Sequence, residues 1–448
     1  MNGACSKPAL VIGGGIAGLT AAVELADAGC AVILVEKSPS LGGRVARFHQ
    51  YFPKLCPPAC GLEMHYRRLR ESASIAVLTL AEVTEVSGPA GDYQATVALR
   101  PRFVTEDCTV CGDCAGVCPG EREDDFNYAM AATKAAYLPG GIPYPARYAI
   151  DRSACPSGCR RCVEACKYGA IRLDGETEIR KYNVSAIVAA TGWKPYDAAK
   201  LENLGFGRYR NVVTNTMLER MAASGGPTAG RILRPFDGKE PRTVAFVQCA
   251  GSRDENHLNY CSAVCCAASI KQAAYIRALY PETAITIFYI DVRTPGRLEE
   301  FSARVQRDAD IRLIKGKVAR VEENPATGDL LVTAEDVLAN RKSTQHFELV
   351  VLATGIVPQT EGLPEALGRD ECGFLDARNG RPGMYAAGCV HRPGEVSSTV
   401  QDATAAALKA LQCARGACFS LPAWRGPVEA RTGGQAKASP TGRVSDAR

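Results

Sequence analysis

The chain has 448 residues, of which 46% are hydrophobic, and a formal net charge of +5. This length suggests two or three domains with a sizeable core, and the mild charge, without a basic stripe, argues against nucleic-acid binding. No apolar run approaches the roughly 20 residues needed to cross a bilayer, and 20 cysteines without an export signal indicate a soluble protein of a reducing, cytoplasmic compartment.

The first predicted unit, residues 9–36, reads as a strand, a glycine-rich turn, a helix and a second strand that ends at Glu36. The turn matches the G-x-G-x-x-G dinucleotide fingerprint, whose glycines permit a tight turn, approach of a pyrophosphate and close helix packing. The helix amino terminus favours phosphates, and Glu36 is expected to accept hydrogen bonds from the adenosine ribose. The predicted binding residues of the turn are Gly13, Gly15, Ile16, Ala17 and Gly18.

Residues 36–44 indicate which dinucleotide is bound. The pair Glu36-Lys37 and the run LGGR at 41–44 resemble the extended fingerprint of flavoproteins with two dinucleotide-binding domains. This resemblance implies an α/β, Rossmann-like, disulfide-reductase-like fold with FAD as the cofactor. The further FAD-binding residues that it implies are Lys37, Gly43, Arg44, Val83, Thr191, Gly192, Gly388 and Cys389. Cys389 stands where that family usually has Asp. The change removes one expected hydrogen bond to the ribityl chain of the flavin, but it does not argue against flavin binding.

The segment 52–61 carries two thiols, Cys56 and Cys60, in a proline-stiffened loop. The loop follows the phosphate-binding segment, so both thiols are candidates for a position near the isoalloxazine ring, and Cys60 is a hypothetical redox residue. Buried or idle thiols are at least as good an interpretation of each. No constellation of nucleophile, His and acid indicates catalysis by side chains, so electron transfer is assigned to the cofactors.

Two runs of four cysteines predict a bacterial-type ferredoxin module at residues 105–173. The first run has the C-x2-C-x2-C-x3-C-P spacing, and the second has three residues in its first gap instead of two. In such pairs the fourth cysteine of each run ligates the cluster of the other run, which predicts two [4Fe–4S] clusters. The expected ligands are Cys108, Cys111, Cys114 and Cys166 for one cluster, and Cys155, Cys159, Cys162 and Cys118 for the other.

Zinc and a disulfide framework are the competing interpretations of these runs. Structural zinc usually takes two separated C-x-x-C knuckles and does not call for the trailing C-x3-C-P, whereas a chain of this length needs no disulfide staples. The spacer 119–154, rich in Tyr, Pro and Gly, is longer than a minimal ferredoxin needs and is predicted to form a partner-facing loop. A strand at 170–173 is expected to close the module.

A second βαβ unit is predicted from residue 242, with strands at 243–247 and 284–290 around a helix near 262–280. Its first turn lacks the glycine fingerprint of an NAD(P)H site and carries cysteines instead. We expect Cys261 and Cys265 to share one helix face at i and i+4, near an amino terminus whose dipole favours thiolates. This predicts a third [4Fe–4S] cluster, whose ligands are Cys249, Cys261, Cys265 and Cys266. On spacing alone, a vicinal dithiol or buried thiols are equally good interpretations.

The predicted organisation is therefore a flavin domain in three parts with two other units between them. Its parts are 1–104, 174–241 and 346–420; the ferredoxin-like insert is 105–173, the second Rossmann-like domain is 242–345, and a disordered tail is 421–448. Within the second domain, residues 315–337 read as a hairpin around the turn 324–329.

Three segments resemble the family of the heterodisulfide reductase flavoprotein, its A-type component, and more closely the branch of that family in the quinone-interacting membrane-bound oxidoreductase complex. They are YFPKLCPP at 51–58, FVQCAGSRDENH at 246–257 and YCSAVCC at 260–266. In that family the cysteines that match the third predicted site hold an unconventional cluster. The resemblance extends to about residue 411.

This resemblance implies an electron-transfer subunit, peripheral at the inner face of the cytoplasmic membrane, that works between menaquinone and adenylylsulfate reductase in dissimilatory sulfur metabolism. The implied partners are adenylylsulfate reductase, a second flavoprotein of the same type and a haem b membrane subunit. An electron-bifurcating subunit of heterodisulfide reductase is the alternative. An NAD(P)H-dependent reductase is disfavoured by the missing second glycine fingerprint.

Overall fold

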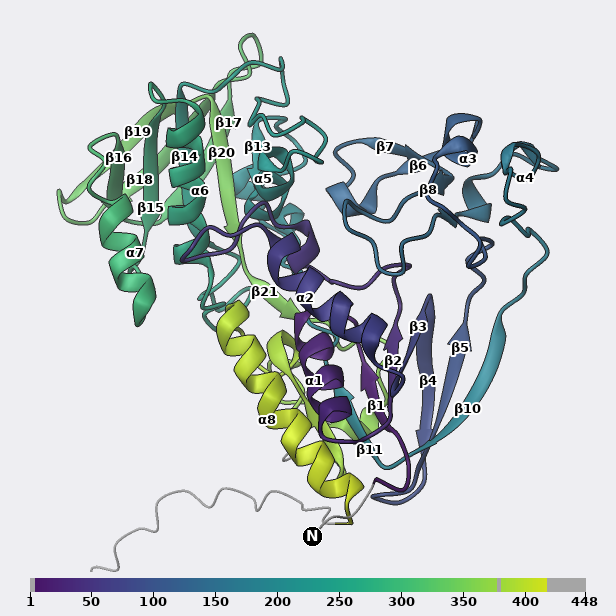
Figure 1. Ribbon diagram of the computed structural model, residues 1–448. Helices are drawn as coiled ribbons and strands as arrows, with labels where there is room; N and C mark the ends of the chain where they lie inside the picture. The colour runs from purple at the N-terminus through teal and green to yellow at the C-terminus, as the bar shows by residue number, and fades with distance from the viewer. Residues whose placement is uncertain (1–4, 377–379, 417–448) are drawn as a thin grey trace, which may run out of the picture.

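The computed structural model describes residues 5–376 and 380–416, so the predicted tail 421–448 lies outside the described residues. Two parallel five-stranded sheets form the centres of two domains, and a small module with short elements adjoins them (Figure 1). The α/β fold with two dinucleotide-binding domains, predicted from the sequence, is confirmed. None of the described helices is both long enough and apolar enough to span a bilayer.

The first sheet has the strand order β22-β11-β1-β2-β3, and all its strands run parallel. Helices α1, α2 and α8 cover one face, and the antiparallel sheet β10-β5-β4 covers the other (Figure 1). The bounds are β1 Ala9–Ile12, α1 Ile16–Asp27, β2 Val32–Glu36, α2 Pro58–Glu71, β3 Ile75–Thr79, β4 Ala81–Ser87, β5 Tyr93–Leu99, β10 Glu178–Val184, β11 Ala186–Ala189, β22 Met384–Ala386 and α8 Val396–Ala414.

Burial on both faces explains why the strands of this sheet are apolar throughout. Along β1, Ala9 and Val11 pack against the helices, whereas Leu10 and Ile12 pack against the antiparallel sheet. Parallel strands covered on both faces read as continuous apolar runs, because neither set of alternate side chains reaches water. The carboxyl ends of β1 and β2 lie side by side at one edge of the sheet, where the glycine-rich turn begins.

The second sheet repeats this plan with the order β13-β20-β14-β15-β16. Helices α5, α6 and α7 cover one face, and the antiparallel sheet β17-β18-β19 covers the other. Strand β12 follows β11 of the first sheet, strand β21 follows β20 of the second sheet, and the two strands pair as an antiparallel ribbon. The bounds are β12 Trp193–Pro195, β13 Val212–Thr214, α5 Asn215–Ala222, β14 Thr243–Ala250, α6 Cys265–Leu279, β15 Ala284–Tyr289, α7 Arg297–Val305, β16 Ile311–Lys315, β17 Val318–Glu323, β18 Leu330–Asp336, β19 Arg341–Phe347, β20 Leu349–Thr354 and β21 Ile356–Pro358.

The cysteine-rich module at 105–173 consists of short elements around its own small core. Figure 1 shows it above the free ends of β4, β5 and β10. Its elements are α3 Asp113–Gly116, β6 Glu121–Glu123, β7 Ala132–Lys134, β8 Ala136–Tyr137, β9 Ala149–Ile150 and α4 Arg161–Ala165. The base of the module is closed by an isolated antiparallel bridge between Val104 and Ile171.

Three predictions about local structure need correction. The predicted strand at 170–173 is wrong, because only the single bridge at Ile171 forms there. Helix α6 begins at Cys265, so Cys261 lies in the preceding loop, and the argument that both share a helix face is wrong. Strands β13 and β20 pair within the second sheet, although the predicted flavin-domain segments 174–241 and 346–420 contain them. The hairpin predicted at 315–337 is confirmed by β17 and β18.

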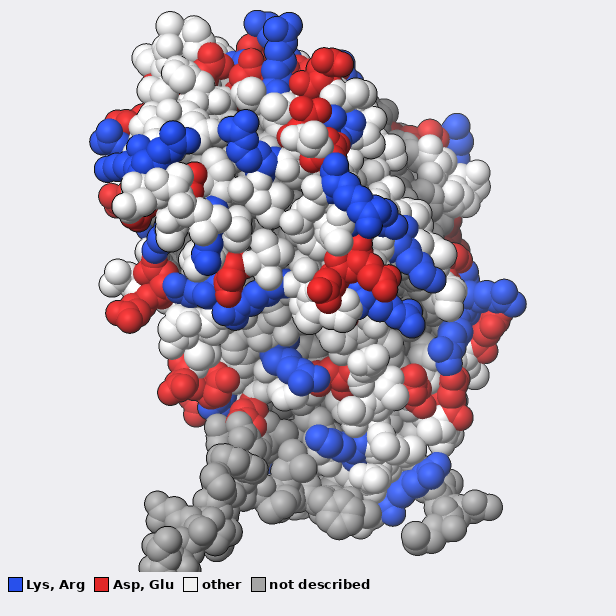
Figure 2. Space-filling model, turned by 90° about the vertical axis from the view of Figure 1, so that its left-hand side faces the viewer, with Lys and Arg blue, Asp and Glu red and all other residues white. Residues whose placement is uncertain are grey.

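Charge is spread evenly over the side of the molecule drawn in Figure 2. Basic and acidic side chains are interspersed there, without a field of one sign. This distribution fits the small net charge of the chain, +5.

Candidate flavin and iron–sulfur site

The glycine-rich turn between β1 and α1 is built as the fingerprint requires. Gly13 has φ +108, and a Cβ there would overlap with the backbone oxygen of Ala190, the residue after the neighbouring strand β11. A Cβ on Gly18 would overlap with the backbone oxygen of Gly13, so the helix packs directly on the turn. Only glycine is tolerated at such close approaches. Gly15 is the N-cap of α1, which leaves the unpaired N–H groups of the first helical turn directed at the space above it.

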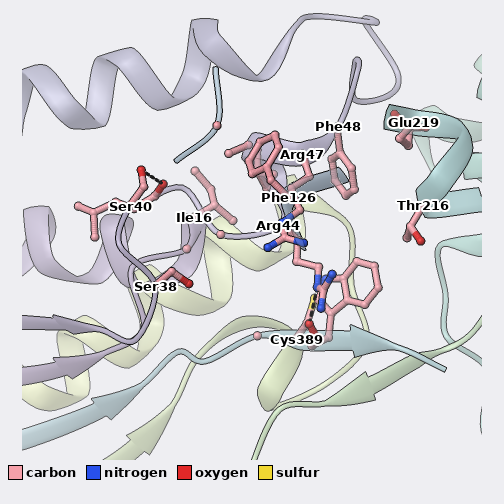
Figure 3. Close-up of a pocket in the computed structure, with 18 of the residues that line it drawn as sticks. Ile16, Ser38, Ser40, Arg44, Arg47, Phe48, Phe126, Thr216, Glu219 and Cys389 are labelled. Atoms are coloured by element: carbon pink, nitrogen blue, oxygen red, sulfur yellow. Dashed lines mark hydrogen bonds between the residues drawn. The ribbon is translucent and has the colours of Figure 1, made fainter. Parts of the chain in front are cut away.

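A cavity of about 590 Å³ opens above this turn (Figure 3). Most of the predicted FAD-binding residues line it: Gly13, Gly15, Ile16, Ala17, Glu36, Lys37, Gly43, Arg44, Thr191, Gly192 and Cys389. Gly18, Val83 and Gly388 do not. Gly18 packs beneath the turn, and the Val83 side chain is buried in the core between the two sheets. Gly388 instead donates its N–H to Asp402 at 2.7 Å, next to Cys389.

Glu36 at the end of β2 is fixed by two backbone donors. Its Oε2 accepts from the N–H of Gly14 at 2.6 Å, and its Oε1 accepts from the N–H of Ser38 at 2.7 Å. Carboxylate oxygens keep further lone pairs when they accept one hydrogen bond each. Glu36 can therefore receive ribose hydroxyls at the place where the sequence predicts them.

Basic side chains form the next part of the cavity wall. Arg44 donates through Nε to the backbone oxygen of Trp193 at 2.8 Å and through Nη1 to the hydroxyl of Tyr128 at 3.1 Å. Its guanidinium also lies 5.2 Å from the centre of the Trp193 ring. Arg47 beside it is half-buried, and desolvation is the first cause that lowers the pKa of this guanidinium from its ordinary value. Fixed cations and helix N–H groups together suit a diphosphate.

The spacer 119–154 forms another wall of the cavity, which the sequence did not predict. Residues 124–127 and 137–142, with Arg122 and Thr133, line the cavity. Asn127 accepts from Nε of Arg220 at 2.7 Å. The N–H of Tyr144 donates to Oγ of Ser40 at 3.0 Å, and its backbone oxygen accepts from the N–H of Leu41 at 2.9 Å. The spacer therefore covers the candidate flavin site, and the prediction of a partner-facing loop is wrong for these residues. Its length and its many aromatic residues were the available signal.

A buried ion pair lies in the part of the cavity wall that α5 and α6 form. Nζ of Lys271 is 2.9 Å from Oε1 of Glu219, and these side chains are 3% and 4% exposed. Gln272 donates to the same carboxylate oxygen at 2.7 Å, and Lys271 also donates to the backbone oxygen of Gln50 at 2.6 Å. All three side chains line the cavity. Sequence reasoning missed this pair, although a lone lysine within the largely apolar helix α6 is a recognisable signal.

Cys389 lines the cavity as a buried thiol. Its Sγ lies 3.4 Å from the backbone oxygen of Gly394, and burial raises the pKa of the thiol. It is therefore a neutral donor where a carboxylate is expected in related flavoproteins. Cys56 and Cys60 do not line the cavity, although Tyr51 and Phe52 just before them do. Cys60 is exposed in the first turn of α2.

The predicted crossing of the ferredoxin cysteines brings four thiols to one small cavity. Its wall contains Cys108, Cys111, Cys114 and Cys166, which come from both runs. Cys114 is on α3 and is buried, whereas Cys111 is exposed. Burial, and then the thiols of Cys108 and Cys111, raise the pKa of Cys114 to about 11.

The other four thiols of the module are also electrostatic neighbours. Burial raises the pKa of Cys162 first, and the thiols of Cys155, Cys118 and Cys159 raise it further. Cys118 and Cys162 are buried, and Cys155 follows directly on a short 3-10 turn capped by Asp151. Each run therefore contributes thiols to both groups, in the arrangement expected of paired cubane sites.

The four cysteines of the second domain meet at the amino terminus of α6. Cys249 has φ +55 at the end of β14, Cys261 lies in the loop, and Cys265 and Cys266 open the helix. The pKa of Cys265 is raised first by burial and then by the thiols of Cys249, Cys266 and Cys261. Val264 and Ala268, which flank Cys265 on the chain, line the large cavity. The start of α6 therefore belongs both to the group of four cysteines and to the wall of the candidate flavin site.

The chemistry of these donors fits iron–sulfur clusters. Neighbouring buried thiols stay protonated without a metal, because thiolates would repel one another there; a bound metal offsets this repulsion, and the protons are released to solvent. Within the described ranges, no three Cys, His, Asp or Glu side chains converge closely enough for a single metal ion. A [4Fe–4S] cube carries its thiolates on four separate irons, so its ligands need not meet around one point.

Comparisons with known proteins bear on the fold and on the relatives of the chain. A model of the NAD(P)-binding Rossmann-like domain matches residues 11–67. The A-type component of the H(2):CoB-CoM heterodisulfide,ferredoxin reductase of Methanothermobacter marburgensis is 38% identical over 436 residues, which cover 94% of this chain and 64% of the relative. An A-type iron-sulfur component of the CoB--CoM heterodisulfide reductase of Methanopyrus kandleri is 41% identical over 417 residues, which cover 90% and 63%.

The chain is similar to the A-type component of heterodisulfide reductase. It spans just under two thirds of the length of these two relatives. Among solved structures, thioredoxin reductase of Lactococcus lactis aligns with a TM-score of 0.52 at 14% identity, covering 91% of this chain and 99% of that chain. The T. acidophilum enzyme aligns with a TM-score of 0.50 at 15% identity, covering 91% and 98%. At such identities these structures show the shared fold alone.

Proposed function

We propose that this chain is an oxidoreductase subunit that binds FAD and three [4Fe–4S] clusters and transfers electrons within a larger complex. The observation that carries the proposal is the position of α6. Its first turn bears the thiols of Cys265 and Cys266, and the same helix lines the large cavity at Ala268, Lys271 and Gln272. A two-electron cofactor and a one-electron cluster would thus be neighbours across one turn of helix.

The residues of the first domain would hold FAD along the length of the cavity. The N–H groups at the start of α1, with Arg44 and Arg47, would bind the diphosphate, and Glu36 would bind the ribose. The buried pair of Lys271 and Glu219 would place a positive charge and a proton acceptor at the wall that α5 and α6 form. When bound, FAD supplies the ability to take two electrons and release them singly.

The twelve candidate thiolates would hold the three clusters. The ferredoxin module takes two of them, with ligands from both runs, and the loop before α6 with its first turn takes the third. Arg122 connects the two sites, because it lines the large cavity and pairs with Asp151 at 3.0 Å, just before Cys155. The spacer therefore provides a packed path between the candidate flavin site and the second run of cysteines.

The complex that we propose for this chain works between menaquinone and adenylylsulfate reductase. The support is the resemblance of segments 51–58, 246–257 and 260–266 to that branch of the family. Its partners, at the cytoplasmic face of the membrane, would be adenylylsulfate reductase, a second flavoprotein of the same type and a haem b membrane subunit. A role in a heterodisulfide reductase complex is the second candidate, and the 38% identity to the Methanothermobacter marburgensis relative favours it.

Anaerobic purification from the native host tests both the cofactors and the complex. We expect one FAD and iron for three cubanes per chain, with companion subunits identified by mass spectrometry. Co-purification with a haem b subunit supports the menaquinone role, whereas co-purification with a hydrogenase or formate dehydrogenase supports the heterodisulfide role. Protein without flavin and without acid-labile sulfide after careful reconstitution contradicts the proposal.

A further inference from the structure

Two arginines joined by one aspartate lie beside the third group of thiols. Asp291, just after β15, pairs through Oδ1 with Nη1 of Arg253 and through Oδ2 with Nε of Arg293, the latter at 3.1 Å. The backbone oxygen of Asp291 lies 3.6 Å from Sγ of Cys266. The aspartate is therefore connected to both guanidiniums and to one thiol.

Each arginine is also the electrostatic neighbour of one thiol of the group, Arg253 of Cys249 and Arg293 of Cys261. Backbone groups add to this shell, since the N–H of Ala263 donates to Sγ of Cys261 at 3.4 Å. The thiols thus face two cations and one carboxylate, which lie on the loop after β14 and on the segment after β15.

The backbone holds Arg253 in place rather than leaving it as a surface side chain. Its φ is +56, in the left-handed region that bulky residues rarely adopt. Its N–H donates to the backbone oxygen of Tyr260 at 3.1 Å, and its side chain is 22% exposed. Strained conformations of this kind persist where the surroundings fix them, and they gather at functional sites.

We infer that Arg253 and Arg293 are positioning residues that raise the reduction potential of the third cluster, with Asp291 moderating their charge. This inference rests on the proposed function. A cluster gains one negative charge when it takes an electron, so nearby cations and hydrogen bonds to its sulfurs favour the reduced form. A carboxylate beside the same sulfurs opposes it. The chain would in this way adjust its third cluster to exchange electrons with the flavin across α6.

The test is a potentiometric titration of the reconstituted full chain, followed by electron paramagnetic resonance. The signal of the third cluster is the one that disappears in Cys249→Ser. We expect Arg253→Met to lower its midpoint potential by about 59 mV, which corresponds to a tenfold loss in the one-electron reduction constant. Arg253→Lys should keep most of the potential, and Asp291→Asn should shift it upward.

Lys317→Met is the matched control. This lysine pairs with Asp254 at 2.7 Å, on the same loop as Arg253, and its side chain is 67% exposed. Its removal takes away an equal charge without a thiol contact and should leave the potential unchanged. If Arg253→Met fails to assemble the cluster, Arg293→Met replaces it, because that side chain is 48% exposed and its loss disturbs less packing.

The results separate this inference from the proposed function. Wild-type protein with iron for only two cubanes, and no signal that depends on Cys249, overturns the third cluster itself. A third cluster that is present, but whose potential is equal in wild type, Arg253→Met and Arg293→Met, overturns the role of the arginines alone. A downward shift in Asp291→Asn overturns the role given to the aspartate.

Discussion

The two parallel sheets of this chain have the same plan, but the connection between the first strand and the helix that follows it differs in length and in residue type. In the first domain β1 passes to α1 through the short glycine turn 13–15, whereas in the second domain β14 passes to α6 through the long loop 251–264. Both turns end at a helix amino terminus, where partial positive charge and unpaired N–H groups collect. A phosphate and a thiolate cluster are both anionic, so one fold can serve either by changing the residues of a single turn.

The largest expected effect is the loss of bound flavin when a side chain is added to the glycine-rich turn of the first domain. In Gly18→Val the new side chain overlaps with the backbone of Gly13, so the turn must open. We expect complete loss of bound flavin while cluster iron stays, measured by absorbance and iron assay. Gly116→Ala, where a Cβ meets open space, should keep its flavin. Full flavin occupancy in Gly18→Val would refute the assignment.

Removing a thiol from the second turn should have the converse effect. Cys265→Ser is expected to lose about a third of the iron and to retain the flavin, because one of three clusters lacks a ligand. Cys372→Ser is the control, since this partly buried thiol contacts Asn259 at 3.5 Å outside the three groups. Iron and sulfide assays with flavin absorbance distinguish the two variants. Equal iron in both would contradict the third site.

The next largest effect is expected from breaking the buried ion pair between α5 and α6. Lys271→Met leaves Glu219 charged and buried, which should cost about 3–5 kcal/mol of unfolding free energy. The double variant with Glu219→Gln should recover part of this loss. Denaturant unfolding measures both, and Lys409→Met on the exposed side of α8 should change the unfolding free energy by less than about 0.5 kcal/mol. A single variant as stable as the wild type would show that the pair is not formed.

The smallest effect on the unfolding free energy is expected at Asp402 on α8. Although burial acts to raise it, hydrogen bonds from His391 and Gly388 hold the pKa of Asp402 below its ordinary value. A depressed folded pKa stabilises the fold above the unfolded pKa of about 3.9, and this stabilisation is lost as the pH falls through the folded pKa.

Asp402→Asn should therefore cost about 1–3 kcal/mol at pH 7, and the difference from wild type should shrink as the pH falls below about 4. Unfolding curves at several pH values measure it. Glu371→Gln, an exposed acid nearby, should show no such dependence. A difference between Asp402→Asn and wild type that grows in acid would contradict the assigned contacts.

The features that could be predicted from the sequence are those set by neighbours along the chain. The turn 13–18, the strand before it and the acid at Glu36 are adjacent, so their pattern shows the unit directly. Cysteine spacing likewise suggested two groups of thiols, and the members of one of them, Cys108, Cys111, Cys114 and Cys166, line one small cavity. The start of α6 was placed too early, because residues 261–264 have helix-compatible composition, but tertiary contacts of Ser262 with Ser252 and Ile356 fix a loop.

Features set by contacts between distant segments could not be predicted in this way. The pair of Lys271 and Glu219 joins two helices far apart in sequence, and Asp291 reaches the thiols only because β15 lies beside β14. The spacer 119–154 was read as a separate loop, since nothing in its composition identifies the wall against which it folds. Sheet membership of β20 was misjudged because an Ala-Thr-Gly ending occurs after strands of both domains.

The spacer's position also bears on the order of maturation. Its two ends are fixed by the cysteine runs, and its middle covers the candidate flavin cavity. A chain that emerges without iron would leave those ends loose and the cavity without one wall. We expect newly made protein from iron-starved cells to lose its flavin readily, so that iron supply decides whether the yellow cofactor is retained.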